Sequence, residues 1–303
     1  MSSKSLPKLI VLLGPTSSGK TSLSISLAKK YNGEVISADS RQVYTGLNLG
    51  TGKVTKKEME GIPHHLLDVA NPKKQFSISE FKTLAEKAIE DIFARGNTPI
   101  ICGGTGFYID TLVNGIVLPE VPPNKKLRDK LTKLSAQELF KQLKKLDPVR
   151  AQNIEKENPV RLIRAIEIAT ALGKVPTLEK KAVPYQTLKI GLDMPDETLK
   201  ARINERLKTR LKAGMLREAT NLHAKGLSWL RMRELGLEYR AMANLLTGKI
   251  EKEEFETQLA FDIWHYAKRQ RVWFKRDQTI NWFDPLVKKN LKTIDGLVKK
   301  FLN

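Results

Sequence analysis

Eight consecutive residues match the phosphate-binding pattern G-x-x-x-x-G-K-[ST] without a gap: Gly14, Pro15, Thr16, Ser17, Ser18, Gly19, Lys20 and Thr21. An apolar run, Leu9–Leu13, precedes them, and a helix-like stretch up to Lys30 follows. This order of strand, loop and helix predicts that backbone N–H groups and a helix N-terminus face an anion. Lys20 adds a positive charge, and the Thr21 hydroxyl suits Mg²⁺. The sequence therefore predicts a site for at least two linked phosphates.

Two further loops are expected to open into the same crevice. A short strand at 34–38 ends at Asp39, and a strand at 98–102 runs into a glycine-rich turn that contains Thr105. Strands that alternate with helices predict a parallel sheet, whose carboxyl ends collect ligands. Asp39 is the acidic residue expected at such a strand end facing the phosphate loop. The side chains after it suit hydrogen bonds to the edge of a base: Ser40, Arg41 and Gln42.

The pattern as a whole predicts an α/β fold, with a P-loop NTPase-like core of parallel sheet and flanking helices, plus an all-helical insertion. The core is expected in two parts, 1–120 and 186–303, and the insertion over 121–185. Helix starts are marked by capping signals at Ser77, Ser135 and Asn158. Further elements are expected at about these positions: strands at 188–192 and 279–283, and helices at 197–213, 216–224, 231–246 and 253–276.

Composition narrows the class of protein. The chain has 303 residues, of which 41% are hydrophobic and 28% charged, as is typical of a globular protein. No apolar run approaches the ~20 residues that span a bilayer. The N-terminus shows no apolar segment of a signal peptide, and a single cysteine excludes an internal disulfide. We therefore expect a cytoplasmic protein without a membrane partner. Nothing in the sequence demands a dimer, so we expect a monomer.

The net charge of +20 favours a nucleic-acid partner. It is unevenly distributed. Residues 121–210 hold 21 lysine and arginine residues against 11 aspartate and glutamate residues. Residues 265–303 hold 10 against 3, so the two stretches carry 17 of the 20 net charges. The alternative is a solvated basic surface that serves solubility alone.

An ordered set of motifs resembles the tRNA dimethylallyltransferases. The set covers nearly the whole chain: GPTSSGKT, then ISADSRQVYTGLNLGTGK at 36–53, PHHLLD at 63–68, GGTGFY at 103–108, NPVRLIRAIEI at 158–168, RINER at 202–206 and YAKRQRVWFKR at 266–276. One segment departs from the family pattern, RELGLEYR at 233–240, where many members have a shorter segment. The resemblance is to the bacterial type, without a C-terminal zinc finger.

The resemblance implies transfer of a dimethylallyl group from dimethylallyl diphosphate to N6 of adenine-37, beside the tRNA anticodon. The phosphate loop would hold the leaving diphosphate with Mg²⁺, Lys20 and an arginine, for which we expect Arg206 first and Arg202 second. Asp39 corresponds to the general base, and Thr105 to a residue that hydrogen-bonds near the reacting amine. The residues expected to contact the anticodon stem-loop are Asp39, Ser40, Arg41, Gln42, Thr105, Arg128, Arg161, Arg164, Lys268, Arg269 and Arg271. The insertion is expected to bind tRNA.

Other functions stay open at this point. An adenylate isopentenyltransferase that acts on free nucleotide shares the core motifs, although it needs no basic surface. A P-loop kinase and a non-catalytic RNA-binding protein are more distant alternatives. Asp39 taken alone fits helix capping as well as catalysis.

Overall fold

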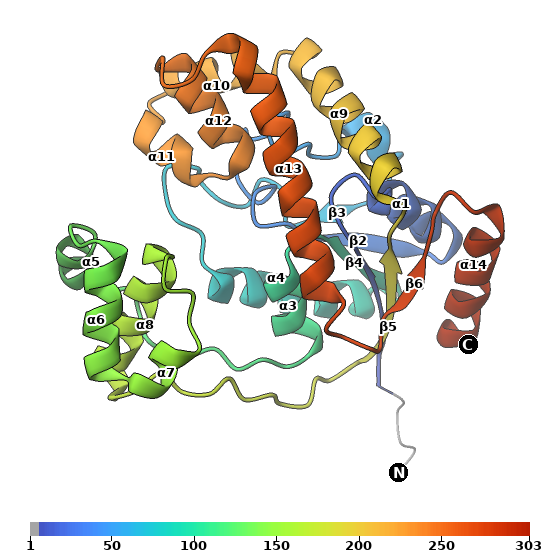
Figure 1. Ribbon diagram of the computed structural model, residues 1–303. Helices are drawn as coiled ribbons and strands as arrows, with labels where there is room; N and C mark the ends of the chain where they lie inside the picture. Colours follow the sequence, from blue (N-terminus) through green and yellow to red (C-terminus); the bar gives the residue numbers. More distant parts are fainter. Residues whose placement is uncertain (1–5) are drawn as a thin grey trace. The chain divides into compact units, whose positions relative to one another are not determined.

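The fold is built on one parallel sheet. The computed structural model describes residues 6–303, and within them six strands lie in the order β3-β2-β4-β1-β5-β6, with every neighbouring pair parallel (Figure 1). The strands are β1 Lys8–Leu13, β2 Gly33–Ala38, β3 His64–His65, β4 Thr98–Gly103, β5 Gln186–Leu192 and β6 Asn281–Phe283. The predicted α/β class, a parallel sheet flanked by helices, is confirmed.

Helices follow the first strands and then dominate the C-terminal part. Those of the first part are α1 Lys20–Lys30, α2 Lys56–Met59, α3 Ile78–Ala94 and α4 Gly106–Val113. Those of the second part are α9 Asp196–Lys212, α10 Met215–Ala224, α11 Trp229–Glu234, α12 Leu237–Leu246, α13 Lys252–Phe274 and α14 Lys288–Leu302.

The two faces of the sheet are covered by different helices. Successive side chains of a strand point to opposite faces, so β1 contributes to two cores. Leu9 and Val11 pack with residues of α3 and α4, whereas Ile10 and Leu12 pack with residues of α1 and α14. Figure 1 shows α3 and α14 on opposite sides of the strands. Because both faces of the sheet are buried, the sequence of β1 is a continuous apolar run from Leu9 to Leu13, which is typical of a parallel sheet.

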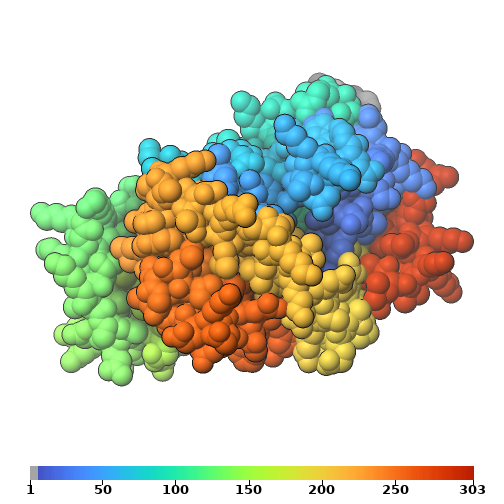
Figure 2. Space-filling view, turned by 90° about the horizontal axis from the view of Figure 1, so that it is seen from above, coloured from blue at the N-terminus to red at the C-terminus, as the bar shows by residue number. Residues whose placement is uncertain are grey.

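A third core joins helices α9 to α13 to the chain that follows β2. Val43, Tyr44 and Leu47 are buried in it together with Leu207, Met215 and other helical residues. Figure 2 shows these helices in yellow and orange, side by side with the blue segment that follows β2. This core attaches the loops at the carboxyl edge of the sheet to a rigid helical layer.

Residues 115–181 form a separate compact unit, whereas the sheet unit comprises residues up to Asn114 together with Ala182–Asn303. The predicted insertion, 121–185, begins six residues later and ends four residues later than this unit. The unit contains α5 Lys125–Leu131, α6 Ala136–Leu146, α7 Pro148–Gln152 and α8 Pro159–Leu172. Its helices share a core that includes Leu139, Leu143 and Leu162, all fully buried.

Most helix starts lie where the sequence predicts them. Ser77 and Ser135 each form a capping box, and Asn158 caps α8 before Pro159. The single helix expected at 231–246 is wrong, because the chain there forms α11 and α12. Gly236 separates them with φ 123° and ψ −176°, a conformation that interrupts a helix and that glycine adopts readily. No helix in residues 6–303 is both long enough and apolar enough to cross a membrane.

A buried carboxylate organises the unit at 115–181. The side chain of Glu167 is 1% exposed and accepts hydrogen bonds from Arg128 (Nε at 2.9 Å, Nη2 at 2.8 Å), Arg164 (2.5 Å) and the backbone N–H of Asn124 (2.6 Å). Burial would raise the pKa of Glu167, but these hydrogen bonds together lower it to about 2. Arg128 and Arg164, which the sequence assigned to tRNA contact, therefore neutralise Glu167 inside the unit and are not freely exposed cations.

Replacing Arg128 by alanine should loosen this unit. Glu167 would stay buried with one partner fewer, so the free energy of local opening should fall by about 1–3 kcal/mol. Hydrogen exchange of the amides of α5, α6 and α8 measures that free energy directly. The matched control is Arg161→Ala, which breaks only an exposed ion pair with Glu155 (3.0 Å) and should cost about 0–1 kcal/mol. Equal protection in the two variants would contradict a structural role for Arg128.

Candidate active site

The phosphate loop connects β1 to α1 at the carboxyl edge of the sheet. Gly14 has φ 140°, and a Cβ there would lie 2.2 Å from the carbonyl oxygen of Leu192, so only glycine fits beside β5. Gly19 precedes α1 with φ 91° and offers no side-chain cap. The first N–H groups of α1 therefore have no capping side chain and remain donors for an anion. The hydroxyl of Ser18 is fully buried and has no hydrogen-bond partner within residues 6–303.

Three cations converge on this loop. Lys20 Nζ donates to the carbonyl of Pro15 at 2.5 Å, which leaves its other donors for phosphate oxygens. Arg206 Nη1 donates to the Thr16 hydroxyl at 3.5 Å, and its Nη2 donates to the carbonyl of Gly52 at 2.8 Å. Arg202 lies one turn earlier on α9, and its Nη2 is 3.9 Å from the position of a Cβ on Gly19. Both arginines expected at a diphosphate thus border the loop.

Two of these cations, Lys20 and Arg206, are partly buried. Desolvation is the largest cause that lowers the pKa of Lys20 to about 8; Arg206 adds to the effect, while Cys102 and Asp39 oppose it. Desolvation, followed by the charge of Arg210, also lowers the pKa of Arg206. Like charges held together with little solvent are costly unless an anion joins them. The loop is therefore arranged for a multiply charged anion such as diphosphate.

The Asp39 and Thr105 loops meet directly beside this site. The backbone N–H of Ser40 donates to the Thr105 hydroxyl at 3.1 Å, and the N–H of Thr105 donates to the carbonyl of Ala38 at 3.2 Å. Asp39 Oδ1 accepts from the backbone N–H groups of Arg41 (2.8 Å) and Gln42 (3.3 Å). Among the described residues, Asp39 Oδ2 forms no hydrogen bond. One oxygen therefore fixes the turn, and the other is available to a substrate.

The remaining predicted contact residues divide into internal and surface groups. Arg41 donates to the carbonyl of Glu234 at 3.3 Å, and Gln42 donates to the carbonyl of Gly52 at 3.5 Å. Lys268, Arg269 and Arg161 are exposed. The expectation for Arg271 is corrected by the structure. Its buried guanidinium binds the carboxylates of Asp193 (2.7 Å) and Asp196 (2.5 Å) and the carbonyl of Met194 (2.6 Å), so it serves the core.

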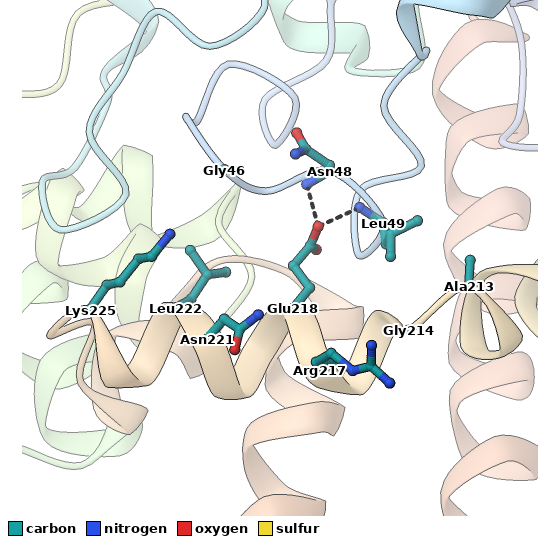
Figure 3. A pocket seen from close by; sticks show the side chains of 10 residues that line it. All are labelled: Gly46, Asn48, Leu49, Ala213, Gly214, Arg217, Glu218, Asn221, Leu222 and Lys225. Carbon is teal, nitrogen blue, oxygen red and sulfur yellow. Dashed lines mark hydrogen bonds between the residues drawn. The ribbon is translucent and has the colours of Figure 1, made fainter.

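A carboxylate outside the predicted site holds the chain that Arg206 contacts. Glu218 on α10 accepts the backbone N–H groups of Asn48 (3.0 Å), Leu49 (2.8 Å) and Gly50 (2.9 Å), together with the hydroxyl of Tyr239 (2.5 Å). Figure 3 shows Glu218 reaching up from α10 to this chain at the wall of a pocket of about 370 Å³. None of the predicted site residues lines that pocket. We therefore interpret Glu218 as the anchor of the segment at 48–52.

Gln270 is a site residue that the sequence patterns did not reveal. It is 6% exposed on α13, and its amide bonds both the Thr16 N–H (2.8 Å) and the Gly104 carbonyl (2.9 Å). A signal for it was present, because the motif at 266–276 places Gln270 three residues after Ala267 and four before Phe274, which are apolar and buried on the same helix. Its role could not be read from the motif, since both partners are backbone groups.

No protein cage for a metal ion is present in the described part of the chain, where no three His, Cys, Asp or Glu residues cluster suitably. The hydroxyl of Thr21 is exposed in the first turn of α1 and is a suitable oxygen ligand. Mg²⁺ commonly uses few protein ligands and completes its shell with substrate phosphates and water. The residues present therefore fit a magnesium ion that arrives with a phosphate ligand.

Comparisons with known proteins agree on one family. A family model described as IPP transferase matches residues 42–277. A tRNA dimethylallyltransferase of Anoxybacillus flavithermus is 42% identical over 281 residues, which cover 91% of this chain and 90% of the relative. A tRNA dimethylallyltransferase of Staphylococcus aureus is 42% identical over 293 residues, which cover 93% of this chain and 94% of the relative.

Solved structures show the same likeness. The full-length tRNA isopentenylpyrophosphate transferase of Bacillus halodurans superposes with a TM-score of 0.74 at 35% identity, over 97% of this chain and 96% of that one. A eukaryotic dimethylallyltransferase, crystallised while acting on tRNA, superposes with a TM-score of 0.79 at 29% identity, over 97% of this chain and 79% of that one.

The affinity of the free protein for inorganic diphosphate should depend on pH. Lys20, with its lowered pKa, loses its proton as the pH rises through about 8, so affinity should fall above that value. Isothermal titration calorimetry with Mg²⁺ at several pH values measures this. Lys20→Ala is the control; it should bind about 10–100-fold more weakly and show no break near that pH. The same break in Lys20→Ala would mean that another group titrates.

Proposed function

The chain belongs to the IPP transferase family, and we infer that it is a tRNA dimethylallyltransferase. It transfers a dimethylallyl group from dimethylallyl diphosphate to N6 of an adenine in tRNA and releases diphosphate. The observation that carries this inference is the meeting of three loops at one edge of the sheet: the phosphate loop, the Asp39 loop and the Thr105 loop. A site for linked phosphates thus lies beside a carboxylate, as transfer from a diphosphate to an amine requires.

The phosphate loop serves the leaving group. The bond between the allylic carbon and the diphosphate oxygen breaks as the bond from that carbon to N6 forms. Negative charge grows on the departing diphosphate, where Lys20, Arg206 and the N–H groups of α1 stabilise it and lower the barrier. Arg202 borders the same loop and adds to the positive field. We assign Thr21 as the protein ligand of Mg²⁺, which when bound supplies further positive charge to the phosphates.

Asp39 acts on the acceptor amine, N6 of the adenine. The lone pair of N6 is delocalised into the purine, so the amine must lose a proton as it forms the new bond, and a carboxylate in reach can accept it. The backbone hydrogen bonds to Oδ1 hold the side chain in place, and Oδ2 takes the proton. Thr105 and Ser40 lie beside it and orient the amine. We propose that the adenine is that of position 37, which must leave the stack of the anticodon loop to enter.

The charge distribution supports a large anionic substrate over a free nucleotide. The net charge of +20 exceeds what binding dimethylallyl diphosphate requires. Among the predicted contact residues, Arg161, Lys268 and Arg269 are exposed and form no hydrogen bond to Asp39, Thr105 or the phosphate loop. We therefore propose these three as tRNA phosphate contacts. We also propose that the protein acts as a monomer.

Removing the proposed base should slow the transfer and leave binding intact. Asp39→Asn keeps an oxygen to cap the turn but cannot accept the proton, so kcat should fall by about 10²–10⁴ with little change in KM for dimethylallyl diphosphate. Steady-state assays with labelled dimethylallyl diphosphate and tRNA measure both constants. Asp91→Asn, the same change at an exposed site on α3, is the control. Near-normal turnover of Asp39→Asn would leave Asp39 with the capping role alone.

A comparison of tRNA with AMP as acceptor should separate the alternative functions. Incubated with labelled dimethylallyl diphosphate and Mg²⁺, the protein should label tRNA and leave AMP unlabelled. Labelled AMP would favour the adenylate enzyme instead. Consumption of ATP without label transfer would favour a kinase, and no transfer at all a non-catalytic RNA-binding protein.

The affinity for tRNA should fall steeply with salt, because each neutralised phosphate releases counterions. Replacing Lys268 and Arg269 by alanine should reduce the slope of log affinity against log salt by about one for each phosphate that is no longer neutralised, and Arg161→Ala should do the same. KM for dimethylallyl diphosphate should stay unchanged. The charge-matched control is Lys292→Ala with Lys300→Ala on α14, both exposed. An equal reduction of slope in that control would show that these cations act only through the overall charge.

A further inference from the structure

We propose that Gln270 is a positioning residue for the transfer, and that its side-chain amide sets the separation between the leaving diphosphate and the acceptor amine. The inference rests on the proposed function, because it takes the phosphate loop as the diphosphate site and the Thr105 loop as part of the acceptor site. It goes beyond that function by assigning a task to a residue whose side-chain amide is bonded to the backbone of both loops.

The amide of Gln270 joins the two loops through one hydrogen bond to each. Its Oε1 accepts from the backbone N–H of Thr16 at 2.8 Å, and its Nε2 donates to the carbonyl of Gly104 at 2.9 Å. The side chain is 6% exposed, so water does not compete with these bonds. A Cβ on Gly104 would lie 2.2 Å from Nε2, which means that the glycine lets the amide reach the backbone. The two loops are thus separated by the width of one amide group.

Only a group that both accepts and donates can make this link. A carboxylate can accept from Thr16 but repels the carbonyl of Gly104, since both would present lone pairs. An apolar side chain of the same length fills the space and leaves both backbone groups unpaired. A protonated carboxyl, in contrast, carries an O–H donor and an acceptor oxygen, as the amide does.

Other residues on the same face of α13 hold the acceptor side. Tyr266, one turn before Gln270, has its hydroxyl close to Thr105 and near the charges of Asp39 and Arg41. Trp273, one turn after it, donates to Asp110 Oδ2 at 2.8 Å. Positions 266, 270 and 273 lie on one side of a helix. The Thr105 loop is therefore fixed against a single helix, and Gln270 is the member that also reaches the phosphate loop.

The separation of the loops matters because bond formation requires the reacting atoms about 3–3.5 Å apart and aligned, and a shift of about 1 Å costs on the order of 10² in rate. The amide of Gln270 is bonded to backbone groups of the two loops, so a change there should alter turnover more than binding. This split distinguishes positioning from a binding role and from a loss of folded protein.

The test is Gln270→Glu, compared with wild type in the tRNA assay between pH 6 and about 8.5, with melting temperature measured in parallel. At the upper end kcat should be about 10–100-fold below wild type, with both KM values within about threefold. As the pH falls, the ratio of variant to wild-type kcat should rise, because the protonated carboxyl regains the donor to Gly104. Gln278→Glu, an exposed site, should match wild type throughout.

Each outcome decides a different question. A wild-type protein that does not label tRNA overturns the proposed function. An active wild type with a fully active Gln270→Glu, or a variant whose deficit lies in KM or is independent of pH, overturns the positioning role. If Gln270→Glu melts too low to assay, Tyr266→Phe removes a single hydroxyl from the same helix face. It should lower kcat about tenfold at unchanged melting temperature, and normal turnover there would contradict the arrangement.

Discussion

The gathering of desolvated positive charge around the phosphate loop is the constraint on which the rest of this structure depends. Lys20 and Arg206 repel one another and have lost much of their water, which lowers the pKa of both. Such an arrangement persists only if rigid elements impose it and an anion offsets it in use. The parallel sheet supplies the loop, and α9 supplies the arginines. The segment at 48–52, tied to Glu218, holds Arg206 through the carbonyl of Gly52.

On the acceptor side the group held in place is a negative charge, the carboxylate of Asp39. The sequence position of Asp39 fits both a capping role and a role as general base, and the structure allows both. One carboxylate oxygen caps the turn, while the other has no partner within residues 6–303. A base that is also held by backbone donors cannot swing away from the crevice, which keeps its free oxygen near the amine. The backbone N–H of Ser40 in the same loop donates to the hydroxyl of Thr105, so the Asp39 loop and the Thr105 loop are joined directly.

Local signals predicted much of this architecture. The phosphate loop, the capping boxes at Ser77 and Ser135 and the proline-led start of α8 depend on neighbouring residues, and each lies where the sequence places it. The fates of individual cations depend on distant residues. Arg271 is buried and pairs with Asp193 and Asp196, so motif position alone mistook an internal ion pair for a surface contact. Arg128 and Arg164 pair with Glu167, which the sequence did not predict, and their contact with tRNA stays a prediction. The role of Gln270 was not predicted for the same reason, because its hydrogen-bond partners are backbone atoms of loops more than 160 positions away in the sequence.

The most direct test is a crystal structure of the protein with a non-reactive thio analogue of dimethylallyl diphosphate, Mg²⁺ and an anticodon stem-loop. We predict that the diphosphate lies in the phosphate loop against Lys20 and Arg206. We also predict an extruded adenine whose N6 faces both the allylic carbon and Asp39. A diphosphate bound elsewhere, or an adenine base stacked within its loop and far from Asp39, would contradict it.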